Sequence, residues 1–157
     1  MKSCIFISFF ILSLFSFSTN KDFVDLHFIS TDAEYNIITY KNEIKNYDDF
    51  EFVENGETLI LKSNKKQSKI LKNKIKTKIG EWFCVRGSFE DFKKLVLNFE
   101  FVQYKEDLFN GIVCVYGFSR VFYSNEYIVL DNTKYNTQIT FDNGVITIGH
   151  PIIIGSY

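Results

Sequence analysis

Residues 81–99 read EWFCVRGSFEDFKKLVLNF, and this stretch contains the signals for both a strand and a helix. Glu81–Arg86 is rich in aromatic and β-branched residues, which favours a strand that ends at Gly87. Ser88 and Asp91 have the spacing of a capping box, in which the serine oxygen accepts from the amide three residues on and the acid accepts from the serine amide. The sequence therefore predicts a strand, a glycine turn and a helix in succession.

Apolar side chains in the helical segment recur at steps of three and four residues, as on one face of an α-helix. They are Phe89, Phe92, Leu95, Val96 and Phe99. Aromatic residues at this spacing are much more often core residues than a ligand-binding face, so we assign them to the core. We expect the helix to extend as far as Tyr104 or Asp107.

Short strands are predicted on both sides of this unit. The strand-like segments are Glu34–Asn42, Phe50–Glu54, Thr58–Ser63, Gly111–Tyr116, Glu126–Asp131, Tyr135–Phe141 and Val145–Ile154. Asn55-Gly56 and Asp142-Asn143-Gly144 are hairpin turn signals between such segments. The tract Lys65–Lys78 has no clean helical stripe, so short strands are predicted there too. Mostly antiparallel strands with one or two helices indicate an α+β fold.

Composition indicates one globular domain over residues 20–157. The chain has 157 residues, of which 46% are hydrophobic, and its 18 Phe and 9 Tyr supply a core. No linker is long enough to divide two domains. The formal charge of −1 does not favour nucleic acid as a partner.

The first seventeen residues have the layout of an export signal. Lys2 gives a positive start, and Cys4–Phe17 then carries no charge over fourteen residues. That length is short for a membrane span of about 20 residues. Residues 1–19 are thus either an export signal that is cleaved after small residues or a retained N-terminal anchor. In both cases we expect an exported protein that is extracellular, in the cell wall or on the outer face of the cytoplasmic membrane.

Two cysteines, Cys84 and Cys114, remain once segment 1–19 is set aside. Exported proteins work in an oxidising compartment where cysteines can pair. The alternatives are a disulfide between these two residues and two buried thiols that never meet. Spacing in the sequence does not decide between them, because a disulfide depends on geometry.

The polar residues form no recognisable catalytic or metal-binding pattern. His27 and His150 are the only histidines, and the chain has neither a G-x-S-x-G elbow nor a glycine-rich phosphate loop. Zinc sites need four Cys or His at short spacings, and the acids within residues 48–57 do not follow the Ca²⁺-loop template. We therefore predict no catalytic, cofactor-binding or metal-binding residues. The alternative is an envelope hydrolase that uses one of the histidines or cysteines.

A lysine-rich tract is the clearest charge feature. From Lys62 to Lys78 the chain carries eight lysines and no acid. The candidates for an anionic-ligand patch are Lys65, Lys66, Lys69, Lys72, Lys74, Lys76 and Lys78. Such a surface attracts anionic polymers or lipid headgroups in a salt-sensitive manner. The alternative is a solvated lysine-rich hairpin that protects a sheet edge.

Residues 145–157, VITIGHPIIIGSY, resemble the closing strand of the YwmB family, which are exported proteins of spore-forming Gram-positive bacteria. Ile148–Ile153 match the family's I-G-x-P-I-I tail, and Val115–Ser119 is similar to its G-[FY]-S turn. The similarity covers residues 111–157, whereas the N-terminal half is shorter than in the family and Arg120 stands where proline is common. The resemblance implies a curved antiparallel sheet with helices on one face, similar to the TATA-binding protein, and it assigns no site residues.

Together these features predict an exported, non-catalytic protein of the cell envelope that needs no cofactor. Its expected partner is an anionic wall polymer, a membrane surface or another protein. The resemblance implies a role around sporulation. Besides the hydrolase, a family member that has lost its activity is an alternative, because the N-terminal half is short.

Overall fold

The computed structural model describes residues 22–44, 47, 49–121 and 126–151. The predicted export segment 1–19 and the apolar run Ile152–Ile154 lie outside the described residues. No helix within the described ranges is long and apolar enough to cross a membrane.

Strands make up most of the described chain. They are β1 (Glu34–Tyr40), β2 (Glu51–Asn55), β3 (Thr58–Asn64), β4 (Lys78–Arg86), β5 (Phe101–Phe109), β6 (Ile112–Ser119), β7 (Ile128–Leu130), β8 (Thr133–Tyr135), β9 (Thr137–Asp142) and β10 (Val145–His150). The α-helices are α2 (Lys65–Lys74) and α3 (Phe89–Asn98), and the short 3-10 helices are η1 (Phe23–Asp25) and η2 (Lys41–Glu43).

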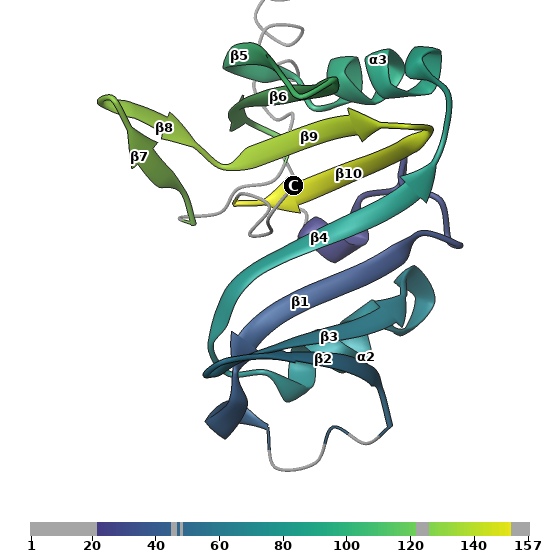
Figure 1. Ribbon diagram of the computed structural model, residues 1–157, viewed down its shortest axis with the longest axis vertical. Coiled ribbons are helices and arrows are strands. Elements are labelled where there is room, and N and C mark those ends of the chain that lie inside the picture. The colour runs from purple at the N-terminus through teal and green to yellow at the C-terminus, as the bar shows by residue number, and fades with distance from the viewer. Residues whose placement is uncertain (1–21, 45–46, 48, 122–125, 152–157) are drawn as a thin grey trace, which may run out of the picture.

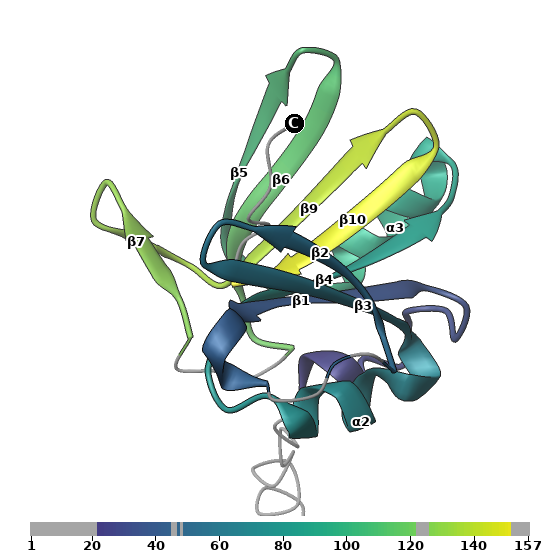
Figure 2. The ribbon, with the colours of Figure 1, turned by 60° about the horizontal axis from the view of Figure 1, so that its bottom comes forward.

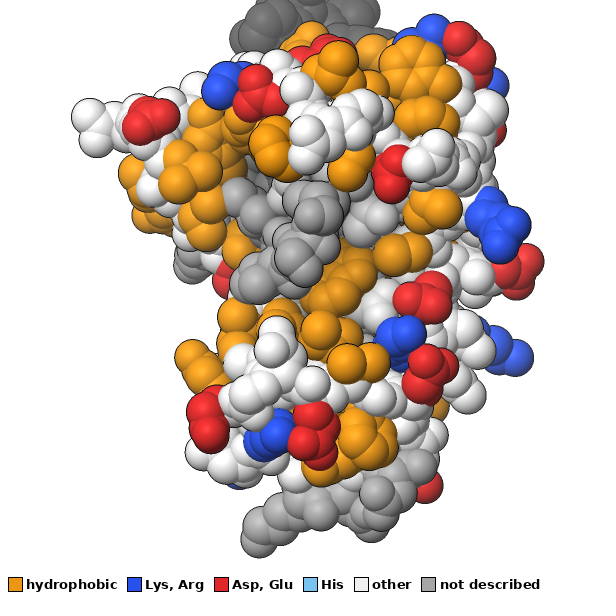
Figure 3. Space-filling view, in the orientation of Figure 1, with side chains coloured by type: hydrophobic (Ala, Val, Ile, Leu, Met, Phe, Trp, Pro, Cys, Tyr) orange, Lys and Arg blue, Asp and Glu red, His pale blue; other side chains and the backbone are white. Residues whose placement is uncertain are grey.

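Eight strands form one open antiparallel sheet in the order β2-β3-β1-β4-β10-β9-β6-β5 (Figure 1). The sheet twists strongly between its two ends (Figure 2). β7 and β8 form a separate hairpin that projects from the sheet, and apolar side chains gather on it (Figure 3). The predicted α+β class with a mostly antiparallel sheet is confirmed, while the closer comparison with the TATA-binding protein stays a prediction.

One face of the sheet forms the core. Residues in register across five neighbouring strands point to this face and are buried, namely Tyr35, Phe83, Ile148, Ile139 and Val115. Both α-helices cover this face, which we call the helix face. Leu71 of α2 is buried, and Phe92 of α3 packs against Phe141 on β9 with ring centroids 5.9 Å apart. The prediction of helices on one face of the sheet is therefore confirmed.

The capping box predicted for α3 is present. The Ser88 hydroxyl accepts from the amide of Asp91, and the Asp91 carboxylate accepts from the amide of Ser88. The predicted extension to Tyr104 or Asp107 is wrong, because α3 ends at Asn98 and the chain turns back as β5.

The lysine-rich tract is a helix, so the strands predicted over Lys65–Lys78 are wrong for most of it. Asn64 caps α2, with its side-chain oxygen 2.9 Å from the amide of Gln67. Ser68 and Leu71 are fully buried on the inner side of this helix. The apolar stripe is short because the inner positions also include the stems of lysines, which bury their methylene groups and keep the ammonium near the surface.

Candidate functional site

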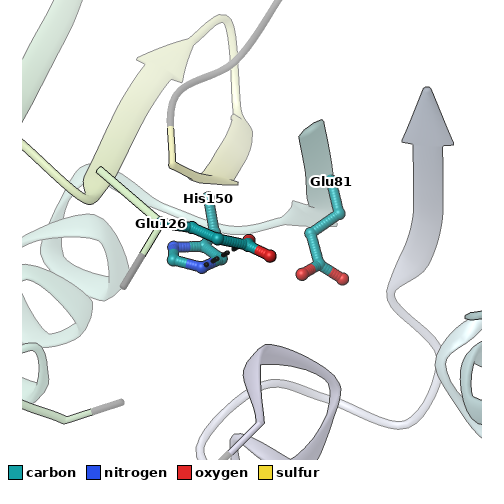
Figure 4. Close-up of side chains that lie close together, drawn as sticks. All are labelled: Glu81, Glu126 and His150. Carbon is teal, nitrogen blue, oxygen red and sulfur yellow. Dashed lines mark ion pairs between the residues drawn. The ribbon is translucent and has the colours of Figure 1, made fainter. Parts of the chain in front are cut away.

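A cluster of charged side chains lies on the helix face where β4 begins and β10 ends. Glu81 on β4 is completely buried, and His150, its register partner on β10, is 2% exposed. Glu126, from the segment before β7, lies beside both of them (Figure 4). We call the charge cluster the set Asp22, Tyr35, Lys72, Lys78, Glu81, Glu126 and His150.

Both carboxylate oxygens of Glu81 are occupied. The Tyr35 hydroxyl donates to Glu81 Oε2 at 2.6 Å, and Lys72 Nζ lies 3.1 Å from Oε1. Lys78 Nζ also contacts Oε1. A buried carboxylate is costly unless it is paired and hydrogen-bonded, and these three donors meet that requirement.

Glu126 and His150 extend the cluster toward the surface. Glu126 Oε2 is 2.5 Å from Lys78 Nζ and 3.3 Å from His150 Nε2. The hydrogen bond to His150, followed by the contact with Lys78, lowers the pKa of Glu126 to about 2. The other ring nitrogen of His150, Nδ1, is 2.7 Å from the carbonyl oxygen of Asn136, which fixes the orientation of the ring.

Lys72 joins α2 to both the sheet and the start of the described chain. Its ammonium contacts Asp22 as well as Glu81. Burial alone would lower the pKa of Lys72, but the two carboxylates more than offset it and the pKa is raised. Burial and the charge of Glu81 raise the pKa of Tyr35, so its hydroxyl stays a donor.

Three members of the cluster have the spacing of a metal site. The ligand atoms of Glu81, Glu126 and His150 lie within 4.8 Å of one another. However, Lys78 Nζ contacts both carboxylates and so takes the position between them that a cation would occupy. A metal ion would have to displace this ammonium, and the geometry therefore favours an ion-pair network over a metal centre.

The hollows described on the surface lie away from the charge cluster. The one of about 510 Å³ is at the other end of β4, where Glu34, Cys84 and Arg86 line it. A second, of about 230 Å³, lies between α3 and residues 28–30. The cluster lines neither of these hollows.

The cysteines that were candidates for a disulfide are too far apart to form one. Cys84 on β4 and Cys114 on β6 lie on one line across the sheet, with Thr147 and Thr140 between them. Three strand spacings of about 4.8 Å separate them by roughly 14 Å, while a disulfide requires Cα atoms within about 7 Å. Both are free thiols, and the alternative of two cysteines that do not meet is the correct one.

The residues named for a hydrolase do not converge. His150 points to the helix face, whereas Cys84 and Cys114 point to the opposite face by strand alternation. His27 lies in the turn after η1, is exposed and packs edge-on against Phe28. Burial raises the pKa of both thiols, which does not favour a nucleophilic thiolate.

The lysines proposed as an anionic-ligand patch are mostly used within the chain. Lys65 donates to the backbone carbonyl oxygens of Leu26 and Ile29. Four other lysines form ion pairs with acids elsewhere in the chain. These pairs are Lys69 with Asp25, Lys72 with Asp22 and Glu81, Lys74 with Asp49, and Lys78 with Glu81 and Glu126. Lys66 and Lys76 are exposed and form no ion pair with any described residue. The surplus positive charge therefore lies on the outer side of α2 and just after it.

Four members of the charge cluster were not predicted from the sequence, namely Asp22, Tyr35, Glu81 and Glu126. One signal was available for Glu81, because an acid inside a strand that is otherwise aromatic and β-branched must find cationic or hydrogen-bonding partners. Nothing in the sequence identifies those partners, which come from β1, α2 and the start of β4.

No protein-family model matches this chain, and neither a curated protein nor a solved structure matches it. The resemblance to the YwmB family therefore stays a prediction.

Proposed function

We propose that this chain is an exported, non-catalytic protein of the cell envelope whose helix α2 lies against the anionic outer face of the cytoplasmic membrane. The observation that supports this most is the position of the start of the described chain. Asp22 and Asp25 form ion pairs with Lys72 and Lys69 of α2, so η1 lies alongside this helix (Figure 2). The apolar segment Cys4–Phe17 precedes Asp22 by only a few residues. A segment retained in the bilayer would therefore hold α2 close to the headgroups.

The outer side of α2 has the composition of a surface that contacts lipid headgroups. Its exposed residues are Lys66, Gln67, Lys69, Ile70, Asn73 and Lys74, with no acid among them. Ile70 is 59% exposed and lies one helical turn from Lys66 and from Lys74. Basic side chains around an exposed apolar residue suit the boundary between headgroups and acyl chains.

The expected electrostatic attraction is modest. A lysine near an anionic membrane surface contributes about 1 kcal/mol. Lys66 and Lys76, which form no ion pair with a described residue, therefore supply about 2 kcal/mol together. That is too little for stable binding by itself, because lasting attachment needs two signals. The proposal therefore includes segment 1–19 as a retained anchor, with α2 setting the orientation of the domain.

The charge cluster supports a structural role over a catalytic one. It ties residue 22, α2, β1, β4, β10 and the segment before β7 into one unit. Because both oxygens of Glu81 are engaged, no carboxylate oxygen of this buried residue is left to act on a substrate. The cluster instead keeps α2 fixed relative to the anchor.

Amine labelling of the full chain in vesicles tests this proposal. The protein is reconstituted with phosphatidylcholine, with or without phosphatidylglycerol, and its lysines are methylated and quantified by mass spectrometry. We expect Lys66 and Lys76 to be protected only in the anionic vesicles and exposed again at high salt. Lys94 on α3 is the matched control, since it is exposed and should react equally in both. Equal labelling of Lys66 and Lys76 in the two lipids would contradict the proposal.

A further inference from the structure

We infer that β5 is a self-association edge, at which two copies of the chain pair antiparallel about Glu106. This inference goes beyond the proposed function and does not depend on it. The sheet has two edges, β2 and β5. Edge strands of native proteins are usually short or charged, which prevents pairing with another chain.

Both edges carry ion pairs, Glu51 with Lys62 at 3.1 Å and Glu54 with Lys41 at 2.6 Å beside β2, and Lys105 with Asp107 at 3.2 Å on β5. The edges differ in length and in the apolar side chains that they expose, and β2 has only five residues. β5 has nine residues, and four of its large apolar side chains are more than half exposed. These are Val102 at 51%, Tyr104 at 60%, Leu108 at 73% and Phe109 at 62%. No described strand pairs with the outer side of β5.

The turn between β5 and β6 fixes which backbone groups point outward. Asn110 and Gly111 form a two-residue loop with φ of 52° and 85°, as in a type I′ turn. In such a hairpin the flanking pair, Phe109 and Ile112, exchanges hydrogen bonds, and the pattern alternates along the strand. The amide and carbonyl groups of Tyr104, Glu106 and Leu108 therefore point away from β6, available to a new strand.

One register matches side chains on both faces. When two β5 strands pair antiparallel with Glu106 at the twofold axis, Tyr104 lies opposite Leu108 of the second copy. On the other face, Lys105 lies opposite Asp107 of the second copy, so the ion pair that these two residues form within each chain at 3.2 Å is extended across the interface. The first pair is apolar and the second has opposite charges, and both kinds of cross-strand pair are stabilising. Tyr104 and Leu108, which β5 exposes on the helix face, thus pack against each other across the interface.

Neighbouring registers lack this match. With residue 105 on the twofold axis, Lys105 lies opposite Lys105 and Glu106 lies opposite Tyr104. With residue 107 on the axis, Asp107 lies opposite Asp107 and Glu106 lies opposite Leu108. The favoured register has one defect of its own, because Glu106 meets Glu106 at the axis. Like charges directly opposite each other weaken a strand pair, so the dimer should tighten when this charge is removed.

Cysteine cross-linking tests both the interface and its register. Directly opposed residues in a hydrogen-bonded pair have Cα atoms about 5.5 Å apart, which suits a disulfide. Under a mild oxidant, full-length Glu106→Cys in detergent should give a 106–106 link. A mixture of Lys105→Cys and Asp107→Cys should give 105–107 links in preference to 105–105 or 107–107. Val53→Cys, at the centre of the β2 edge, is the matched control and should stay monomeric.

Sedimentation of the variants supplies a second readout. Leu108→Lys should make the protein monomeric at concentrations where the parent dimerises, with an unchanged circular-dichroism spectrum. Glu106→Gln should lower the dimer dissociation constant by roughly 1.5- to 5-fold, whereas Glu57→Gln, an exposed acid away from β5, should not. A parent that stays monomeric, a 106–106 link no more abundant than 105–105, or no effect of Leu108→Lys would overturn the inference.

Discussion

Replacing Glu81 with glutamine removes the charge at the centre of the cluster while keeping the size of the side chain. Glutamine retains an oxygen that can accept from the Tyr35 hydroxyl. The change leaves the ammonium groups of Lys72 and Lys78, which are 23% and 11% exposed, without their shared buried carboxylate. Losing one partner of a buried ion pair costs about 3–5 kcal/mol. Since Asp22 and Glu126 still contact the two lysines, we expect the lower end, about 3 kcal/mol.

Urea unfolding of the full chain in detergent measures this loss. With a slope of about 2 kcal/mol per M, a loss of about 3 kcal/mol lowers the unfolding midpoint by about 1.5 M. The matched control is Glu51→Gln, because Glu51 is 73% exposed in its pair with Lys62. A surface pair of this kind contributes about 0.2–1 kcal/mol. If Glu81→Gln shifts the midpoint no more than Glu51→Gln, the buried ion pairs of Glu81 do not stabilise the fold.

Because the pKa of Glu126 is lowered to about 2 from its ordinary 4.5, its contribution to stability is present above pH 4.5 and lost as the pH falls toward 2. Glu126→Gln should therefore flatten the acid side of the stability profile, with a small effect because the side chain is half exposed. Because the pKa of Tyr35 is raised above 10.0, its contribution is present below pH 10 and lost above it, and Tyr35→Phe should flatten the alkaline side. Gly117→Ala should destabilise by about 1–3 kcal/mol, since the added Cβ would lie 2.3 Å from the carbonyl oxygen of Gln103 on β5. Lys66→Gln with Lys76→Gln should weaken the association of the domain with anionic vesicles by roughly 30-fold, the equivalent of about 2 kcal/mol.

Each of these has a control in the same chain. The urea unfolding midpoint, measured across pH, tests the predictions for Glu126→Gln and Tyr35→Phe. Glu90→Gln, on the exposed side of α3, should leave the acid side of the stability profile unchanged. Gly87→Ala is the control for Gly117→Ala, because its Cβ would meet the end of the Ile146 side chain, which can move. Lys93→Gln with Lys94→Gln removes the same charge from α3, and an equal loss of vesicle binding would count against a specific role for α2.

Local signals predicted the parts of the fold that local chemistry determines. The capping box at Ser88 and the turn at Asn143-Gly144 are set by a few neighbouring residues, and both are present. The turn at Asn110-Gly111 carried an equally strong signal and was overlooked, which is why α3 was extended into β5. α2 was missed because its buried face contains lysine stems, and a hydropathy pattern counts lysine as exposed.

The candidate site could not be predicted in the same way. Glu81 and His150 are opposite each other only because β4 pairs with β10 in one register. Likewise, the acids that neutralise the lysine-rich tract come from residues 22 to 126, so the tract by itself overstated the free positive charge. The sequence alone left the cysteine pairing open, and the strand order then excluded it.

Fluorescence at residue 70 shows whether the outer side of α2 contacts the membrane, as we propose. The chain has one tryptophan, so Ile70→Trp in a Trp82→Phe background reports from α2 alone. Leu97→Trp in the same background reports from α3, where Leu97 is 77% exposed. In vesicles that contain phosphatidylglycerol, we expect a blue shift and quenching by a lipid-bound quencher at position 70 and neither at position 97. An emission at position 70 that stays that of a water-exposed indole would contradict the proposal.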